Sequence, residues 1–215
     1  MNKIILLAVL VILAICKDPP VLAGSFKISY DETFIVDGSK YIVNGQMLYD
    51  ADHNRERVDR TNGRYDLFCS TIVPNISTPC TQITTNNKRY IIFPQRRQCC
   101  FCCSSEKGCG VLRKDWLNGA EYLGTERLID TEFDKWYKKG DFTDNYWWAT
   151  TDKNQIPRRL QEGDDHITDY IPLSYLNKTF TDAEFALPSY CDPETSCPLT
   201  SICGKFREKP TQLYE

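Results

Sequence analysis

Histidine is scarce in this chain: only two, His53 and His166, occur among 215 residues, and each lies in a hydrophilic run. An acyl-transfer triad would have to be built around one of them. The chain also lacks the Gly-x-Ser-x-Gly segment of many hydrolases and the glycine-rich loop that cradles phosphate. We therefore predict no catalytic residue, no enzyme activity and no cofactor, and keep a secreted hydrolase only as a third alternative.

An excess of positive charge is also missing. Lysine and arginine total 26 against 29 acidic residues, a formal net charge of -3, and the two signs are interspersed without a basic stripe. This pattern argues against nucleic acid or an anionic membrane as a partner.

A calcium-binding loop is incomplete in this sequence. Asp50 to Asn54 starts like one, but Arg55 stands where the glycine turn is needed and Thr61 where the bidentate glutamate belongs. We predict no metal site.

Long hydrophobic runs are limited to one, Ile4 to Ala14, which follows Lys3. The run is too short to span a bilayer and has the length of a signal-peptide core. Small residues favour cleavage after Ala23, with a cut after Cys16 as the alternative. The sequence predicts a signal peptide over residues 1–23, no transmembrane span, and a secreted protein or, alternatively, one in the lumen of an endomembrane compartment.

Cysteine, by contrast, is abundant. Of 11 cysteines, Cys16 falls in the leader and ten remain. In an exported chain these favour disulfide bonds. The two-residue spacing within the cluster also fits zinc, and thiol exchange is a further alternative. Because adjacent cysteines rarely bond to each other, we expect the cluster to bond outward to the cysteines before it and in the tail. The ten predicted disulfide cysteines are Cys69, Cys80, Cys99, Cys100, Cys102, Cys103, Cys109, Cys191, Cys197 and Cys203.

Two sequons accompany the cysteines. Asn75-Ile76-Ser77 and Asn177-Lys178-Thr179 have no proline at the middle position and lie in polar, turn-like surroundings. In an exported chain, we predict N-glycosylation at Asn75 and Asn177.

Apolar residues alternate along much of the chain. Phe26, Ile28, Tyr30, Phe34 and Val36 share one side of a predicted strand, and Asp37-Gly38-Ser39 supplies a hairpin turn to a second strand over 41–49. Helical spacing of Leu112, Trp116, Ala120 and Leu123 predicts a short helix that Gly124 ends. The tail from Cys191 is predicted to be held by disulfide bonds and to have little regular structure. Further strands are predicted over 55–60, 64–72, 89–93, 125–129, 133–138, 146–151 and 157–161.

Several segments resemble a known protein family. Gly45 to Asp50 followed by Arg55 to Arg60 resembles the paired strands of the ependymin-related secreted proteins and of a family of uncharacterised secreted proteins in plants and protists. The likeness to the latter family continues through Leu112 to Gly124, Trp136, Trp147-Trp148, Ile156 to Arg159 and Leu187 to Cys191.

The resemblance implies a fold similar to LolA-type lipoprotein carriers. We accordingly expect a mainly β (α+β) fold: a strongly bent antiparallel sheet, a half-barrel with one or two short helices. It would occupy residues 24–190, followed by a cysteine-containing tail over 191–215.

Aromatic residues are plentiful, with four tryptophans, 12 tyrosines and ten phenylalanines. Rings usually pack a core, but a concave sheet lined by rings can also hold a lipid. The main hypothesis is therefore a non-catalytic carrier of an apolar small molecule or lipid. The alternative is a self-associating component of an extracellular coat. The predicted ligand-binding residues are Trp116, Trp136, Tyr146, Trp147 and Trp148.

Overall fold

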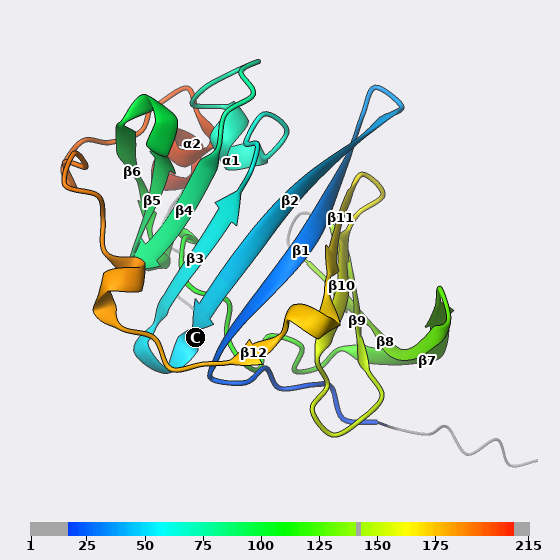
Figure 1. The fold of residues 1–215 in the computed structure, drawn as a ribbon. Coiled ribbons are helices and arrows are strands. Elements are labelled where there is room, and N and C mark those ends of the chain that lie inside the picture. Colours follow the sequence, from blue (N-terminus) through cyan, green and yellow to red (C-terminus); the bar gives the residue numbers. More distant parts are fainter. Residues whose placement is uncertain (1–16, 141–142, 209–215) are drawn as a thin grey trace, which may run out of the picture.

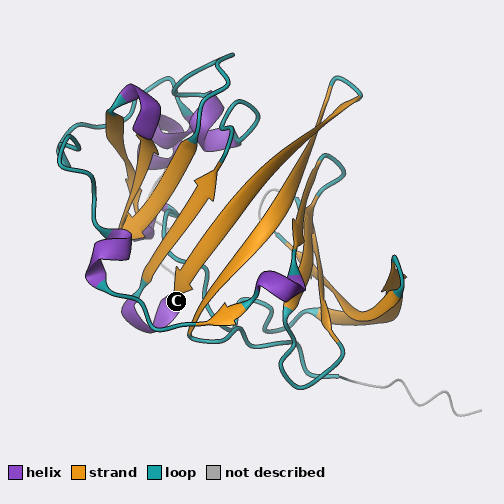
Figure 2. Ribbon diagram, viewed as in Figure 1, coloured by secondary structure: helices purple, strands orange, loops and turns teal. Residues whose placement is uncertain are grey.

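A computed structural model describes residues 17–140 and 143–208, which form one 12-stranded sheet (Figures 1 and 2). The apolar run of the predicted leader and Cys16 lie outside these residues. The strands are β1 (Ser25–Val36), β2 (Ser39–Asp50), β3 (Arg55–Arg60), β4 (Cys80–Thr85), β5 (Lys88–Phe93), β6 (Gln98–Ser104), β7 (Glu121–Leu128), β8 (Thr131–Lys139), β9 (Asp144–Thr150), β10 (Pro157–Glu162), β11 (His166–Tyr170) and β12 (Leu176–Asn177).

Helices are short and lie outside the sheet. The two α-helices are α1 (Leu67–Ser70) and α2 (Ile202–Glu208), and the 3-10 turns are η1 (Ala51–His53), η2 (Pro94–Arg96), η3 (Ser105–Lys107), η4 (Pro172–Ser174) and η5 (Asp182–Phe185). Across the parts of the chain that the structure describes, no helix combines the length and apolarity needed to cross a membrane.

The sheet consists of two antiparallel meanders that meet at β1. The chain builds outward from β1 to β6, crosses to the opposite edge, and returns from β7 to β11, which pairs with β1. The sheet bends strongly around this centre, so that one side is concave (Figure 1). These features confirm the predicted mainly β class with a bent antiparallel sheet.

Alternation along β1 and β2 decides which side chains face the concave side. Phe26, Ile28 and Tyr30 are buried there, opposite Tyr49, Met47 and Gly45 of β2. Asp37 and Gly38 connect the two strands with φ values of 50° and 73°, the left-handed conformation that tight hairpins need. This hairpin is as predicted.

The segment that joins β6 to β7 crosses the concave side and covers part of it. We call residues 111–120 the crossing segment. Leu117 is buried in it, and the Trp116 ring meets the Trp147 ring edge-on at 5.4 Å between centroids. The main core therefore lies between the crossing segment and the inner faces of β1, β2, β8 and β9.

The predicted helix over this region is wrong. Residues 114–119 form a succession of turns, and Gly119 has a φ of 77°. Strand β7 begins at Glu121. Its register opposite β8 shifts between Tyr122 and Gly124, which forms a bulge, and Gly124 has a φ of 96°. Burial of Trp116 and Leu117 against the sheet outweighs the helical spacing.

Three other local predictions need correction. Residues 67–70 are helix α1, not part of a strand over 64–72, because the Asp66 carboxylate caps the backbone N–H groups of Phe68 and Cys69. The tail contains helix α2. Strands β4, β6 and β11 were not predicted, since each carries polar residues or cysteines at positions that the sheet buries.

Residues 17–24 pack onto the sheet. Leu22 is buried, and its backbone N–H donates to the Lys114 carbonyl at 2.9 Å. Lys17 forms an ion pair with Asp134, a carboxylate that is 1% exposed. A cut after Ala23 would remove both contacts, whereas a cut after Cys16 would keep them.

We therefore expect the mature chain to begin at Lys17. A chain that starts at Gly24 should unfold at a lower temperature than one that starts at Lys17, because burial of one leucine contributes about 1.5 to 3 kcal/mol. Thermal melts of the two chains and N-terminal sequencing of the exported protein measure this. Equal melting temperatures, or a native N-terminus at Gly24, would contradict it.

Candidate functional site

Five disulfides join the ten cysteines of the described residues. Strand β6 is tied to the tail three times, by Cys99–Cys191, Cys100–Cys197 and Cys102–Cys203. The other two bonds are Cys69–Cys80 and Cys103–Cys109. The prediction of disulfide bonding is thus confirmed, but the outward routing of the whole cluster is wrong. Cys69 bonds to Cys80, and Cys103 bonds within the cluster.

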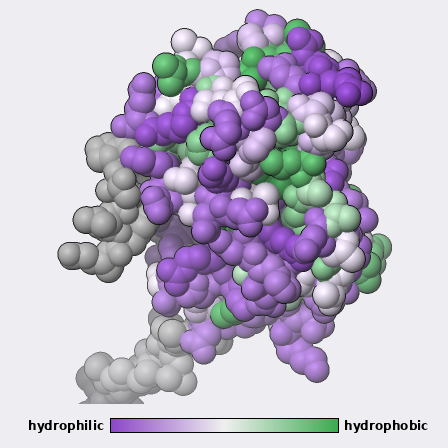
Figure 3. Space-filling view, turned by 90° about the vertical axis from the view of Figure 1, so that its left-hand side faces the viewer, coloured by the Kyte–Doolittle hydropathy of each residue, from purple (hydrophilic) through white to green (hydrophobic). Residues whose placement is uncertain are grey.

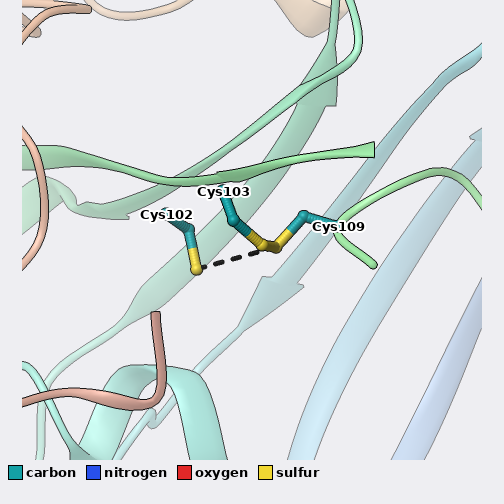
Figure 4. Close-up of side chains that lie close together, drawn as sticks. All are labelled: Cys102, Cys103 and Cys109. Atoms are coloured by element: carbon teal, nitrogen blue, oxygen red, sulfur yellow. Dashed lines mark hydrogen bonds between the residues drawn. A yellow bond between two sulfur atoms is a disulfide. The ribbon is translucent and has the colours of Figure 1, made fainter. Parts of the chain in front are cut away.

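Strand geometry explains this pairing. Cys100 and Cys102 face the inner side of β6, and Cys99 faces the outer side, where Cys191 lies. A register shift between β5 and β6 brings Cys103 to the inner side as well. The sulfur atoms of Cys102, Cys103 and Cys109 consequently lie within 4.8 Å of one another (Figure 4). Each is already in a disulfide, because Cys103 bonds to Cys109 and Cys102 bonds to Cys203, which Figure 4 does not draw.

A cavity of about 680 Å³ opens on the part of the concave side that the crossing segment leaves uncovered. Strands β1, β2, β3, β10 and β11 form its floor, and helix α1 and Leu112 form its walls. Its apolar lining consists of Tyr30, Phe34, Ile35, Val36, Met47, Val58, Tyr65, Leu67, Phe68, Leu112, Leu160 and Tyr170. We call this space the concave cavity.

A buried group of charges lies within the same lining. The Arg60 guanidinium donates to both oxygens of Glu32, at 2.6 and 3.0 Å, and lies 3.3 Å from an oxygen of Asp66. His166 contacts Glu32 at 2.8 Å through Nε2 and Glu162 at 3.0 Å through Nδ1. Gly45 leaves room for the neighbouring Tyr30 ring, because a Cβ there would lie 2.2 Å from that ring.

These contacts set the ionisation of the group. Burial by itself would raise the pKa of Glu32, but the Arg60 charge and the hydrogen bonds from His166 and Arg60 outweigh it and hold the pKa at about 2. Burial would lower the pKa of His166, but its hydrogen bonds to Glu162 and Glu32 raise that pKa to about 10. Both groups are therefore charged at neutral pH.

A second hollow, of about 1020 Å³, adjoins the concave cavity beneath the crossing segment. Glu56, Arg89, Leu112 and Glu162 line both spaces. Arg89 donates to the Gly110 carbonyl at 2.9 Å and lies over the Phe68 ring, so it joins helix α1 to the residue that precedes the crossing segment.

The five aromatic residues predicted to bind a ligand lie elsewhere. Trp136 and Trp147 are 0% and 2% exposed and pack in the main core under the crossing segment. Tyr146 and Trp148 lie on the outer face, where Lys135 approaches both rings. Trp116 alone lines a hollow, the second one. None of the five lines the concave cavity.

Glu32 and Arg60 were not predicted as site residues, and His166 was considered only as a histidine for an acyl-transfer triad. A signal for the first was present: Glu32 occupies the inward position between Tyr30 and Phe34 in the alternating pattern of β1. The structure also places both sequon asparagines at the surface, Asn75 in a turn with a φ of 61° and Asn177 in β12.

A family model described as Domain of unknown function (DUF8395) matches residues 61–191, more than half of the chain. The chain belongs to this family. No curated protein matches the DUF8395 chain. The ependymin-related likeness has no counterpart in these comparisons and stays a prediction.

Three solved structures that are similar to the DUF8395 chain come from bacteria and have different descriptions. An uncharacterized conserved protein from Thermus thermophilus has a TM-score of 0.49 at 10% identity, over 76% of this chain and 86% of that one. A LolA superfamily protein from Nitrosomonas europaea has a TM-score of 0.41 at 11% identity, over 78% and 93%. A DUF1329 family protein from Desulfovibrio piger has a TM-score of 0.35 at 10% identity, over 76% and 90%.

The buried charges predict how stability depends on pH. Because the folded pKa of Glu32 is about 2 and its usual value is 4.5, its stabilisation should be lost as pH falls from about 4.5 toward 2. Because the folded pKa of His166 is about 10 and its usual value is 6.5, its stabilisation should fade as pH rises from 6.5 toward 10. Urea midpoints across this range measure both effects. His166→Gln should abolish the alkaline loss, and an unchanged alkaline slope would contradict the assignment.

The three tail disulfides of the DUF8395 chain should be redundant. Each closes nearly the same long loop, with sequence separations of 92, 97 and 101. Replacing one pair by alanines leaves that loop closed, whereas replacing all three pairs opens it, which costs about 4 to 5 kcal/mol for a loop of this length. The triple replacement should therefore cost more in urea unfolding than the three single ones added together. Additive costs would contradict the prediction.

Proposed function

We propose that this DUF8395 protein is a secreted, non-catalytic carrier that binds an elongated apolar ligand in the concave cavity. The observation that carries the proposal is the cavity itself: about 680 Å³ on the concave side, with an apolar lining that runs from the sheet centre to the mouth. A volume of this size is typical of small-molecule sites.

The energetics of burial support an apolar occupant. Met47, Val58 and Leu160 come from three different strands and present only carbon and sulfur atoms to the cavity floor. Each buried methylene of a ligand contributes about 0.8 kcal/mol. An acyl chain of about fourteen carbons would thus gain roughly 10 kcal/mol before the costs of ordering are subtracted.

Three apolar side chains stand among the exposed residues of the cavity lining. Ile35 and Val36 at the tip of the β1–β2 hairpin are 41% and 40% exposed, and Leu67 at the start of α1 is 57% exposed. All three line the cavity, so an entering apolar ligand can contact carbon atoms at its edge. The face shown in Figure 3, by comparison, is mostly hydrophilic with scattered hydrophobic patches.

The environment of the two histidines favours binding over catalysis. His166 contacts two carboxylates, and His53 contacts the Asp50 carboxylate at 2.9 Å. An acyl-transfer site would place a hydroxyl or thiol against one of these rings. In the described residues, the contacts of both rings are to carboxylates and to the Phe34 ring.

Extracellular location belongs to the proposal. Five disulfides suit an oxidising compartment. Exposed Asn75 and Asn177 are the glycan acceptors we propose, and the apolar run over residues 4–14 is the core of the proposed leader. The carrier domain would end near residue 190, where the disulfide-bonded tail begins.

Uptake of an uncharged fluorescent hydrocarbon such as 1-dodecylpyrene tests the proposal. Leu160→Gln places a polar amide on the cavity floor and should weaken binding by about tenfold or more, since an uncompensated buried amide costs about 1 to 3 kcal/mol. Leu173→Gln is the matched control, because Leu173 is 100% exposed on η4 and lies outside the cavity lining.

Delipidated protein that takes up no probe would refute the carrier function. Large assemblies in sedimentation, together with no uptake, would instead favour the extracellular coat. Equal affinity of the two glutamine variants would show that the probe binds outside the concave cavity.

A further inference from the structure

The charged groups of the concave cavity are unequal in sign. Its lining contains five carboxylates (Glu32, Glu56, Asp66, Glu162 and Asp165) and three basic groups (Arg60, Arg89 and His166). An anionic ligand would therefore enter a space that is already negative. The polar lining disfavours a free carboxylate and suits an uncharged or cationic group.

Most donors of these cations are also engaged; among the described residues, Nη1 of Arg60 is buried without a hydrogen-bond partner. Arg60 is shared between Glu32 and Asp66, and His166 between Glu32 and Glu162, at distances of 3.3 Å or less. Arg89 uses its donors on the Thr84 hydroxyl at 3.2 Å and the Gly110 carbonyl at 2.9 Å. A carboxylate ligand would have to compete with these partners.

Glu56 differs from the other buried acids of the cavity. It is 9% exposed, and its carboxylate accepts no hydrogen bond from the described residues. Its ion-pair partner, an Nη atom of Arg89, lies 3.9 Å away, beyond hydrogen-bond distance. Burial raises the pKa of Glu56, and the charges of Arg89 and Arg60 oppose that rise. No Glu56 oxygen is among the fully enclosed polar atoms without a partner in the described residues, so the carboxylate can be reached from the two hollows and can accept a hydrogen bond from a ligand.

The place of Glu56 fits the end of a ligand. Glu56 lines both the concave cavity and the second hollow, at the point where the two adjoin. A chain that fills the apolar part of the cavity would bring its polar end to this junction.

We propose that the ligand ends in a hydrogen-bond donor, a hydroxyl or an ammonium group, which binds the Glu56 carboxylate, and that the cavity discriminates against fatty carboxylates. This inference rests on the proposed carrier function and names the class of its ligand: long-chain alcohols and amines.

Competition against bound 1-dodecylpyrene tests the selectivity with the full mature chain. Hexadecanol, hexadecylamine and hexadecanoate share one chain length and differ in the end group. Hexadecanol and hexadecylamine should each compete about tenfold better than hexadecanoate. Hexadecanoate that competes as well as the other two would overturn the inference and leave the carrier function intact. No binding of 1-dodecylpyrene itself would overturn both.

The Glu56→Gln variant tests whether Glu56 is responsible for the selectivity. Glu56→Gln keeps the shape and one acceptor oxygen but removes the charge, so hexadecylamine should lose about tenfold in affinity while hexadecanol changes little. Glu121→Gln, at an exposed position on β7, is the matched control. Each variant must bind 1-dodecylpyrene like the wild type, which shows that the cavity is formed. An unchanged preference for hexadecylamine in Glu56→Gln would overturn the role of Glu56.

Discussion

The concave face of the sheet must be covered, and the crossing segment covers only part of it. Alternation along β1 and β2 directs a continuous row of side chains to this one face. Leu117 and Trp116 of the crossing segment cover the part of this face that includes Trp147. The part around Phe34 and Leu160 faces the concave cavity. The cavity and the main core are thus two parts of the same face of the sheet. The length of the crossing segment decides where the main core ends and the cavity begins.

The disulfides protect the edge that this topology leaves at β6. An edge strand offers unpaired backbone groups to other chains. Here the tail pairs with it: the Phe101 N–H donates to the Thr195 carbonyl, and the Cys197 N–H donates to the Phe101 carbonyl. Three disulfides hold the tail in this position. Helix α2 then packs on α1, where the Phe206 and Phe68 rings stack at 5.9 Å, so the tail also supports one wall of the cavity.

The charges in the cavity combine a structural and a chemical role. Replacing a buried ion pair by apolar groups often raises stability, so the Glu32–Arg60–His166 group is a poor explanation of stability alone. It does connect β1, β3 and β11 beside the cavity, and the negative excess of the lining comes from the other carboxylates, Glu56, Asp66, Glu162 and Asp165. Glu56 stands apart from this group, because its oxygens have no donor within the described residues.

Alternation and turn chemistry determined much of the fold locally: the β1–β2 hairpin, β3, β5 and the strands from β7 to β10 follow from period-two patterns, and the cysteine count from the composition. Tertiary packing decided the rest. Whether Leu112 to Leu123 forms a helix depends on what Trp116 can bury against, and the pairing of Cys103 with Cys109 depends on a register shift in β6. The cavity lining depends on which parts of the concave face stay uncovered. Spacing along one strand carries no information about that, because the residues that meet there come from strands far apart in the chain.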